Sequence, residues 1–314
     1  MKAVVMRDHG GPEVLEVREV ERPNPNPVEV RIRTVAAGVN PVDWQVREGS
    51  WVPDVMGEPP MILGWEVAGT VEEAGDSVFR FAPGDRVFGM PWFPHPARCH
   101  AEYVTAPFRH IAHTPEALTD EQAGALPLAG LTAWQALVEV AGVGEGDRVL
   151  VHAAAGGVGH LAVQIAKAHG AYVIGTARAD NHDFLRELGV DEPIDYTAGP
   201  FEEAVSDVDV VLDLVGEDDP SLIRSVEVLR KGGVLVAIAG ELSKNVIRMV
   251  GMQSKRATEI LVAPDDAGLE SLAALADEGT LTVHLERTFP LEHASEAHEL
   301  LREGRVRGKL VLTT

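Results

Sequence analysis

A glycine-rich segment at residues 154–159, with the sequence AAGGVG, has the residue types of a phosphate-binding turn. It follows an apolar strand pattern at residues 148–152 and precedes a helical pattern at residues 160–169. In such a unit, small residues let backbone N–H groups approach a pyrophosphate at the helix N-terminus, where the helix dipole favours negative charge. Ala154 replaces the first glycine of the usual fingerprint, which the turn tolerates if φ stays negative. We therefore predict a dinucleotide site on the turn, at Ala155, Gly156, Gly157, Val158 and Gly159.

The end of the next strand, at residues 173–178, discriminates between the two nicotinamide cofactors. An NAD site usually carries a carboxylate there, about 20 residues after the turn, that binds the ribose 2′-OH. This segment has no carboxylate before Asp180 and instead offers Arg178, whose planar cation suits a 2′-phosphate. We therefore favour NADPH, with Thr176 and Arg178 in its site. A solvated arginine that offsets an acidic surface is the alternative.

Further candidates follow from the rule that ligands of open α/β sheets bind at the carboxyl ends of the strands. Tyr196 ends one apolar strand and is expected near the adenosine. Val215 and Gly216 end the next strand and should pass the nicotinamide ribose, with Ala239 and Gly240 beside them.

The elements that must position these residues differ between the two halves of the chain. Residues 1–115 have the pattern of short strands separated by Gly and Pro turns. From Thr119, a typical N-cap with Gln122 three residues on, the pattern becomes helical. Short apolar strands then alternate with helical patterns, which predicts a parallel sheet with right-handed crossovers. The segment 281–314 has the pattern strand, helix, strand, and its strands resemble those of residues 1–115. We therefore expect this segment to return to the N-terminal domain and complete it.

The overall composition is that of a globular protein. With 314 residues, two domains are the natural expectation, and 45% hydrophobic and 24% charged residues are ordinary values. No apolar run reaches the ~18–20 residues that span a bilayer, and we expect no export signal. The single cysteine, Cys99, excludes an intramolecular disulfide and suits a cytoplasmic protein.

The charge is strongly acidic, with 49 Asp and Glu against 27 Lys and Arg and a net charge of −22. Such a surface repels nucleic acid and anionic membranes, so we expect neither as a partner. It also keeps a protein soluble in concentrated salt, where charge repulsion is screened. A halophilic source is one interpretation. A GC-rich genome that favours arginine is the other, although it leaves the acid excess unexplained.

Five further segments, together with the glycine turn, make the chain resemble a medium-chain dehydrogenase/reductase of the zinc-independent quinone oxidoreductase (zeta-crystallin-like) branch. They are GVNPVDW at 38–44, ILGWEVAGTVEEAG at 62–75, APGDRVFG at 82–89, ALPLAGLTAWQAL at 125–137 and VRGKLVL at 306–312. The fold that the resemblance implies is α/β: a doubly wound Rossmann sheet at 119–279, inserted into a GroES-like β-domain at 1–118 and 280–314.

The resemblance also indicates where a catalytic zinc would bind in the related alcohol dehydrogenases. Segment 38–43 lacks the expected cysteine, and the histidine of the usual Gly-His-Glu motif is Trp65 in Gly64-Trp65-Glu66. Because Cys99 is alone, a four-cysteine lobe is excluded, and we expect no metal site. A set of metal-type side chains in one Pro-rich region is interpreted as plain surface loop, with a rival metal site as the alternative: His95, Cys99, His100, His110 and His113.

The same resemblance suggests the catalytic groups. It puts Asn40 at the nicotinamide, where its amide donates to a developing oxyanion, or else Asn40 caps the turn before Pro41. It puts Thr132 near the nicotinamide as well, the alternative being a helix-interior threonine. Asp43 either relays a proton or is a solvated turn residue, and Arg307 and Lys309 either meet a phosphate or are solvated surface charges. The aromatic walls that would stack on a planar substrate, some of which we expect to be core, are Trp44, Trp51, Trp65 and Trp92.

Without a zinc ion to polarise a carbonyl, the substrate should already be electron-poor, as quinones and α,β-unsaturated carbonyls are. The predicted function is hydride transfer from NADPH to such a substrate. The alternative is an NADPH-binding protein with little turnover, as crystallin-type relatives suggest. The family implies a homodimer through the edge strand of the Rossmann sheet, with which the apolar segment 258–264 is compatible.

Overall fold

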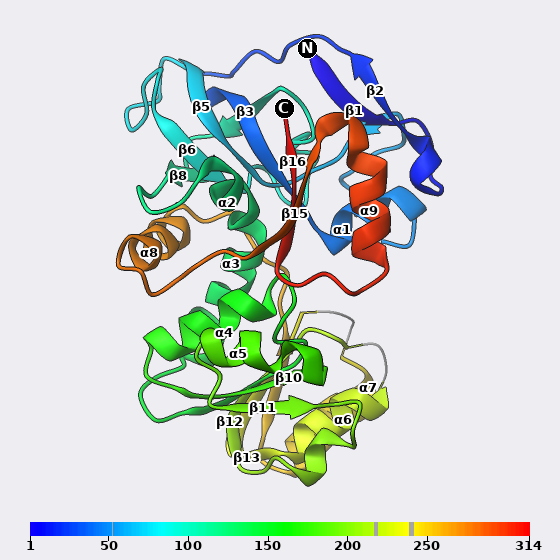
Figure 1. Ribbon diagram of the computed structural model, residues 1–314, viewed down its shortest axis with the longest axis vertical. Coiled ribbons are helices and arrows are strands. Elements are labelled where there is room, and N and C mark those ends of the chain that lie inside the picture. Colours follow the sequence, from blue (N-terminus) through cyan, green and yellow to red (C-terminus); the bar gives the residue numbers. More distant parts are fainter. Residues whose placement is uncertain (52, 217–218, 239–241) are drawn as a thin grey trace. The chain divides into compact units, whose positions relative to one another are not determined.

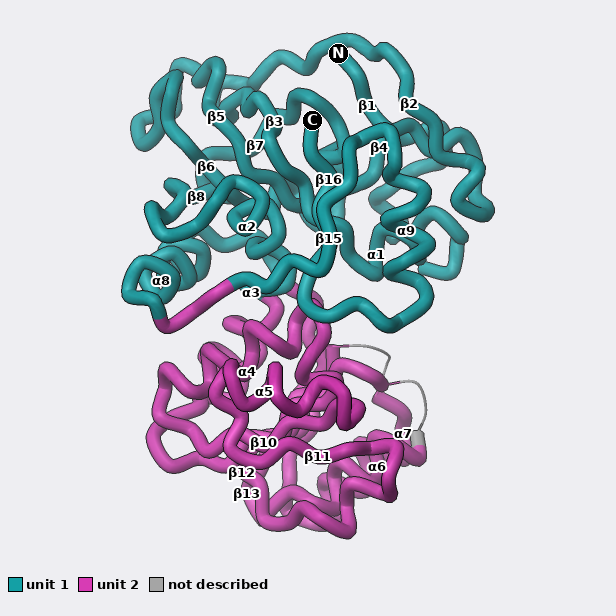
Figure 2. Tube along the Cα trace, in the orientation of Figure 1, with its two compact units in different colours: residues 1–131, 263–279, 283–314 teal, residues 132–262, 280–282 magenta. Residues whose placement is uncertain are grey.

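The computed structural model describes residues 1–314 apart from 52, 217–218 and 239–241. By its internal contacts the chain forms two compact units (Figure 2). Unit 1 comprises residues 1–131, 263–279 and 283–314, and unit 2 comprises residues 132–262 and 280–282. Both chain termini lie in unit 1. The expected domain division at residues 118 and 280 stays a prediction.

Unit 1 is built on mainly antiparallel sheets. One sheet has the strand order β2-β1-β4, and the larger one has β15-β16-β3-β5-β6-β8 with β7 paired to β3. Its strands are β1 (Lys2–Met6), β2 (Leu15–Glu19), β3 (Glu29–Val39), β4 (Met61–Ile62), β5 (Val67–Ala74), β6 (Arg86–Gly89), β7 (Tyr103–Pro107), β8 (Ile111–His113), β15 (Leu285–Pro290) and β16 (Lys309–Thr313).

The C-terminal strands complete the N-terminal sheet, as expected from the sequence. Strand β16 pairs antiparallel with β3, with Leu310 opposite Val39, and β15 pairs parallel with β16. Val39, Phe289 and Leu312 share one buried apolar cluster. Residues from both ends of the chain therefore form a single core.

The helices of unit 1 lie around these sheets (Figure 1). They are α1 (Pro41–Glu48), α2 (Asp120–Ala125), α8 (Asp266–Asp277) and α9 (Ala294–Arg302), and the unit boundary falls within α3 (Pro127–Trp134). The predicted start of α2 is confirmed, because Gln122 N donates to Thr119 Oγ1 and Thr119 N donates to Gln122 Oε1. By contacts, α2 and α8 belong to unit 1.

Unit 2 is the predicted parallel α/β sheet. Its strand order, β11-β10-β9-β12-β13-β14, is the doubly wound order in which the first strand lies at the centre. The strands are β9 (Arg148–Val151), β10 (Tyr172–Ala177), β11 (Glu192–Asp195), β12 (Val208–Asp213), β13 (Leu229–Ala237) and β14 (Arg256–Glu259). The ladder of β14 ends before Leu261, so the expected strand at 258–264 is only partly right.

Four helices pack on the sheet of unit 2: α4 (Gly159–Ala168), α5 (His182–Glu187), α6 (Asp219–Glu227) and α7 (Lys244–Met252). Leu150, Val211 and Leu235 are side by side in the strand register and share a buried cluster with residues of α6 and α7. Helix α4 leads from β9 to β10, in the opposite direction across the sheet from α6, so right-handed crossovers place α4 on the other face. The order in which successive strands are added therefore reverses between β9 and β12, and the loops that follow these parallel strands face a common crevice.

Candidate active site

The glycine turn connects β9 to α4 with tight backbone packing. A Cβ atom on Gly159 would lie 2.3 Å from Ala153 O and 2.7 Å from Ala154 Cα, so only glycine permits this approach of helix and turn. A Cβ atom on Gly156 would lie 3.2 Å from the same carbonyl oxygen. Ala154 is not among the residues with positive φ, as the turn requires, whereas Ala153 has a φ of 46°. The small residues therefore shape the turn as a dinucleotide site needs.

Arg178 lies at the carboxyl end of β10, next to Tyr196 of the neighbouring strand. Both side chains are exposed, and Arg178 Nε donates to Tyr196 Oη at 3.2 Å. The parallel register pairs Ala177 with Asp195, which puts the two following residues side by side. Among the described residues no carboxylate pairs with Arg178, although the chain carries a net charge of −22. The guanidinium can therefore bind an external anion.

Two of the other predicted cofactor residues are held by Asp213, the last residue of β12. Asp213 Oδ1 accepts hydrogen bonds from Val215 N at 2.9 Å and Gly216 N at 2.8 Å. The buried Oδ2 atom has no partner among the described residues. Gly216 takes a φ of 40°, which favours glycine. The predicted residues Ala239 and Gly240 lie outside the described residues.

In unit 1, a buried charged network joins the ends of three neighbouring strands. Asn40 follows β3, Glu66 precedes β5 and Lys309 begins β16. Lys309 Nζ donates to Glu66 Oε1 at 2.8 Å and to Asn40 Oδ1, and Asn40 Nδ2 donates to Glu66 Oε1 at 2.7 Å. The exposed fractions are 2% for Asn40, 0% for Glu66 and 2% for Lys309. The second Glu66 oxygen accepts from Leu128 N at 2.8 Å.

The strand register explains why these residues meet. The β16–β3 ladder pairs Leu310 with Val39, which sets Lys309 opposite Asn40. Glu66 lies across from Gly38 on the other side of β3, where a Cβ atom on Gly38 would lie 1.9 Å from Glu66 Oε1. Glycine at position 38 therefore makes room for the carboxylate. The expectation of Lys309 as a surface charge or phosphate ligand was wrong, because sequence does not reveal the pairing of β16 with β3.

Asp43 is also buried, which contradicts its interpretation as a solvated turn residue. Its exposed fraction is 0%, and its two oxygens accept from Asn40 N at 2.7 Å and from Gly64 N at 3.0 Å. Burial raises the pKa of the Asp43 carboxyl above its ordinary value, and the nearby His100 opposes this rise. Asp43 therefore fixes the start of α1 and the backbone before Trp65.

The residues at the zinc positions do not fit a zinc ion. Trp65 has no metal-binding atom, and its indole N–H donates to His95 O at 2.8 Å. Both oxygens of Glu66 are engaged by other donors. Burial raises the pKa of the Cys99 thiol well above its ordinary value, so without a metal this side chain is a neutral thiol. Across the described part of the chain, no group of three His, Cys, Asp or Glu side chains is placed to hold a metal.

The rival set of metal-type side chains is dispersed. Cys99 and His100 are buried rather than surface residues, each with an exposed fraction of 0%. His100 Nε2 lies 3.3 Å from Gly38 O, and its ring contacts that of His298 with centroids 5.8 Å apart. His110 instead accepts from Trp92 N at 3.1 Å. His113 packs against a phenylalanine ring.

The four tryptophans predicted to line the substrate site do not form one cluster. Trp51 stacks on Phe93 with ring centroids 6.3 Å apart, and Trp65 meets the same ring edge-on at 5.8 Å. Trp65 is fully buried and is therefore core, whereas Trp44 is half-buried in α1.

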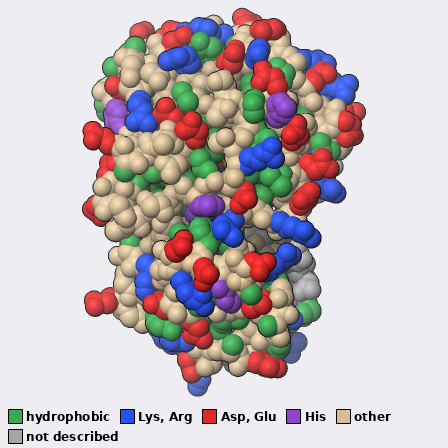
Figure 3. Space-filling model, viewed as in Figure 1, with side chains coloured by type: hydrophobic (Ala, Val, Ile, Leu, Met, Phe, Trp, Pro, Cys, Tyr) green, Lys and Arg blue, Asp and Glu red, His purple; other side chains and the backbone are tan. Residues whose placement is uncertain are grey.

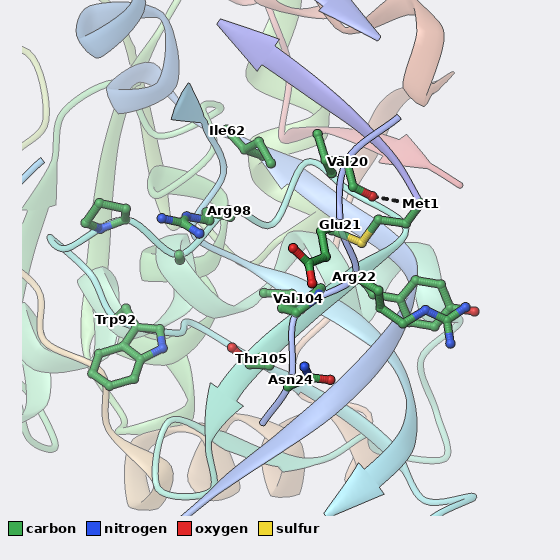
Figure 4. Close-up of a pocket in the computed structure, with 14 residues that line it drawn as sticks. Met1, Val20, Glu21, Arg22, Asn24, Ile62, Trp92, Arg98, Val104 and Thr105 are labelled. Atoms are coloured by element: carbon green, nitrogen blue, oxygen red, sulfur yellow. Dashed lines mark hydrogen bonds between the residues drawn. The ribbon is translucent and has the colours of Figure 1, made fainter. Parts of the chain in front are cut away.

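Trp92 lies apart from this ring cluster, in an open groove of about 400 Å³ within unit 1. Figure 4 shows Trp92 and Arg98 on one side of the groove, and Met1 and Arg22 on the other. Trp92 is 36% exposed and has a φ of 61°, a conformation that is uncommon for a bulky residue.

Thr132, the second predicted catalytic residue, is buried in α3 with an exposed fraction of 2%. Its catalytic role stays a prediction. Sequence reasoning missed the roles of Lys309 and Glu66, and it missed His152 and Asp213, which flank the glycine turn of unit 2. Of these four residues, only His152 could have been found from the sequence, because a histidine directly between an apolar strand and the glycine turn is a signal of a polar role there.

The surface of the protein carries both acidic and basic side chains. On the face drawn in Figure 3, acidic and basic side chains are interspersed over both units. In the described part of the chain, no helix combines the length and the apolar character needed to cross a membrane.

Comparisons with known proteins cover the whole chain. The family model for an alcohol dehydrogenase GroES-like domain matches residues 26–116, and that for a zinc-binding dehydrogenase matches residues 188–312. A 2-haloacrylate reductase from a Burkholderia species is 34% identical over 332 residues, which covers 99% of this chain and 98% of the relative.

Two solved structures extend the likeness to three dimensions. The quinone oxidoreductase from Coxiella burnetii superposes with a TM-score of 0.93 at 39% identity, covering 100% of this chain and 99% of that one. The Escherichia coli quinone oxidoreductase, solved in complex with NADPH, superposes with a TM-score of 0.89 at 28% identity and 100% coverage of both chains. The resemblance proposed from the sequence motifs is confirmed. The chain belongs to the medium-chain dehydrogenase/reductase superfamily, in its quinone oxidoreductase branch, and is an NAD(P)H-dependent oxidoreductase.

Proposed function

We propose that the protein is a zinc-independent, NADPH-dependent reductase of quinones or α,β-unsaturated carbonyls. The observation that carries this proposal is the buried Lys309–Glu66–Asn40 network. Its Glu66 directly follows Trp65, which stands where the family resemblance places a zinc-binding histidine. Trp65 has no metal-binding atom, and both Glu66 oxygens already accept hydrogen bonds. Without a metal to polarise a simple carbonyl, an electron-poor acceptor is the suitable substrate.

The preference for NADPH over NADH rests on Arg178. Its guanidinium is exposed, has no carboxylate partner among the described residues and is held by Tyr196, so it suits the 2′-phosphate. The glycine turn at 155–159 and the turn at 215–216 would hold the pyrophosphate and the nicotinamide ribose. When bound, the cofactor supplies the hydride, and the chain supplies position and electrostatics.

Asn40 is the proposed donor to the substrate oxygen. Lys309 can only donate and Glu66 accepts, so the amide orientation of Asn40 is fixed by chemistry: Oδ1 faces the ammonium and Nδ2 faces the carboxylate. One Nδ2 hydrogen remains for a developing negative charge. Thr132 and Trp51 keep their proposed roles beside the substrate. Asp43 keeps an indirect role, through the backbone of Asn40 and Gly64 that it holds.

The relatives support both substrate classes. One is named for the reduction of 2-haloacrylate, which has an electron-poor carbon–carbon double bond, and others are named quinone oxidoreductases. The alternative, an NADPH-binding protein with little turnover, is favoured by the observation that the two titratable side chains of the network, Lys309 and Glu66, are already paired with each other.

The test is NADPH oxidation with an ortho-quinone, a para-quinone and methyl vinyl ketone, at low and high salt. Turnover with any of them supports a reductase, and the best acceptor identifies the substrate class. Tight NADPH binding without turnover in either salt favours the binding protein. Activity that survives or rises in high salt supports a halophilic source, for which the net charge of −22 is the argument.

We further propose a cytoplasmic homodimer that forms through β14. This strand is the edge of the parallel sheet, and Leu261 beyond it is 60% exposed. An apolar side chain beside an open edge strand favours pairing with a second copy. Light scattering of the wild type and of Leu261→Asp tests this, because the variant should be monomeric if the edge is the interface.

A further inference from the structure

A buried hydrogen-bonded cluster lies beneath the cofactor-facing ends of the strands in unit 2. It consists of His152, Thr176 and Ser225, which we call the strand-end clamp. His152 Nδ1 lies 3.2 Å from Thr176 Oγ1, and His152 Nε2 lies 3.0 Å from Ser225 Oγ. The exposed fractions are 6%, 3% and 0% in the same order. The clamp is therefore an enclosed polar contact at the ends of β9 and β10.

The hydroxyl partners suit a neutral imidazole. A neutral ring has one N–H donor and one acceptor nitrogen, and a hydroxyl can serve either, so both ring nitrogens are satisfied in either tautomer. Burial lowers the pKa of His152 below its ordinary value, while the charge of Asp213 opposes this. His152 also packs edge-on against Phe201 with ring centroids 4.6 Å apart. Apolar packing alone would not require a polar ring here.

The clamp ties together the elements that precede the cofactor loops. His152 is the residue after β9, and its N–H donates to Leu212 O of β12 at 3.0 Å. Thr176 is in β10, two residues before Arg178, and its Oγ1 also accepts from Ala153 N at 3.3 Å. Ser225 is in α6, which follows β12. One imidazole therefore connects β9, β10 and α6 at the point where the strand order reverses.

This placement has a geometric consequence. Ligands of a doubly wound sheet bind in the crevice at the point where the strand order reverses. The width of this crevice depends on the distance between the ends of the strands on either side of it. The first turn residue, Ala153, has a φ of 46°, and its N–H is held by Thr176. A strained backbone conformation persists only where the surroundings fix it. The clamp supplies that constraint directly below the glycine turn.

We propose that His152 is a positioning residue for the cofactor: it holds the glycine turn and the end of β10 at the separation that NADPH requires. The proposal rests on the proposed cofactor function and adds a specific residue to it. His152 acts through its hydrogen bonds to Thr176 and Ser225, so its side chain need not touch the cofactor.

The test compares three variants with the wild type. His152→Phe keeps an aromatic ring beside Phe201 but removes both hydrogen bonds. His152→Asn keeps a polar atom near the position of Nδ1 and can retain the bond to Thr176. His169→Gln is the matched control, because His169 is also a hydrogen-bonded histidine of unit 2 but lies at the opposite end of α4, with Nδ1 2.8 Å from Ile165 O. The readouts are the NADPH dissociation constant by calorimetry, the melting temperature, and KM and kcat.

We expect His152→Phe to raise the dissociation constant and KM for NADPH about tenfold, from the loss of two hydrogen bonds, with kcat at saturation within about twofold. His152→Asn, which can keep only the bond to Thr176, should bind with an affinity between those of His152→Phe and the wild type, and His169→Gln should bind as the wild type does. If His152→Phe lowers the melting temperature but binds NADPH normally, the residue is merely structural and the proposal is overturned. If the phenylalanine variant does not fold, the asparagine variant decides: affinity equal to the wild type with loss of stability overturns the proposal, whereas intermediate affinity supports it. A wild-type protein that binds neither NADPH nor NADH would refute the proposed function itself, and this inference with it.

Discussion

Replacement of Lys309 by methionine should destabilise unit 1 strongly. Methionine matches the length of the aliphatic stem but removes the ammonium, which leaves the Glu66 carboxylate buried with an exposed fraction of 0% and without a counter-charge. Removing one partner of a buried ion pair typically costs about 3–5 kcal/mol. Asn40 Oδ1 loses its donor as well. For a domain of this size, that loss corresponds to a melting temperature lower by roughly 6–20 °C.

Tryptophan fluorescence is a suitable assay, because Trp44, Trp51, Trp65 and Trp92 all belong to unit 1 and therefore report mainly on its unfolding. The measurement is thermal unfolding of the protein without cofactor, so that ligand binding does not add to stability. The matched control is Lys2→Met, which breaks an ion pair of the same N–O distance, 2.8 Å, between side chains that are each 49% exposed. This control should melt close to the wild type, because exposed pairs contribute little.

The double variant Lys309→Met/Glu66→Gln gives the sharpest check of the reasoning. The introduced glutamine would keep an oxygen for Leu128 N, and its amide could donate to Asn40 once the Asn40 amide has turned over. Neither member of the former ion pair then carries a charge, so the double variant should recover more than half of the lost stability. A single variant Lys309→Met that melts within about 2 °C of the wild type would show that the ammonium is solvated, and the argument from the buried network would fail.

The remaining predictions concern the cofactor, the metal and pH. Arg178→Glu should reverse the preference for NADPH over NADH, with Arg186→Glu as an exposed control, and an unchanged affinity ratio would remove Arg178 from the site. Metal analysis of the purified protein should find substoichiometric zinc, and one firmly bound zinc per chain would contradict the mechanism. Burial, with the charges of His100 and Arg47, lowers the pKa of His298 well below its ordinary value, so the unfolded chain takes up a proton first and stability should fall from about pH 7 to about pH 5. In His298→Phe this fall should be smaller, and an identical pH profile would exclude His298 as its source.

The nucleotide-binding half was the more predictable part of the fold. Its signals are local: the glycine turn and the alternation of apolar strands with helices both depend on residues close in sequence. Ala154 keeps the negative φ that the turn was expected to tolerate, and the positive φ falls on Ala153, about which no prediction was made. The sequence cannot show which residue of a turn takes the positive φ when both are alanine.

The buried charged network was not predictable, because its members are brought together by strand pairing across the whole chain. Lys309 follows Arg307 and Gly308 in a short polar stretch, which is the pattern of an exposed turn. Only the antiparallel register of β16 with β3 places it beside Asn40. Asp43 and His100 were misjudged for the same reason: charge predicts exposure unless a partner is known, and the partners here are distant in sequence.

The return of β16 to a position between β15 and β3 also bears on how the chain is synthesised. Residues 132–262 form nearly all of unit 2, so this unit can fold while the ribosome is still adding residues 283–314. Unit 1 has to wait, because β16, an inner strand of its main sheet, is encoded after the whole of unit 2. Until then the edge of β3 stays open and its apolar residues are exposed to other nascent chains. We therefore expect termination just before β16 to be far more damaging than the loss of one strand suggests, since it leaves a folded nucleotide domain attached to an unfinished, aggregation-prone partner.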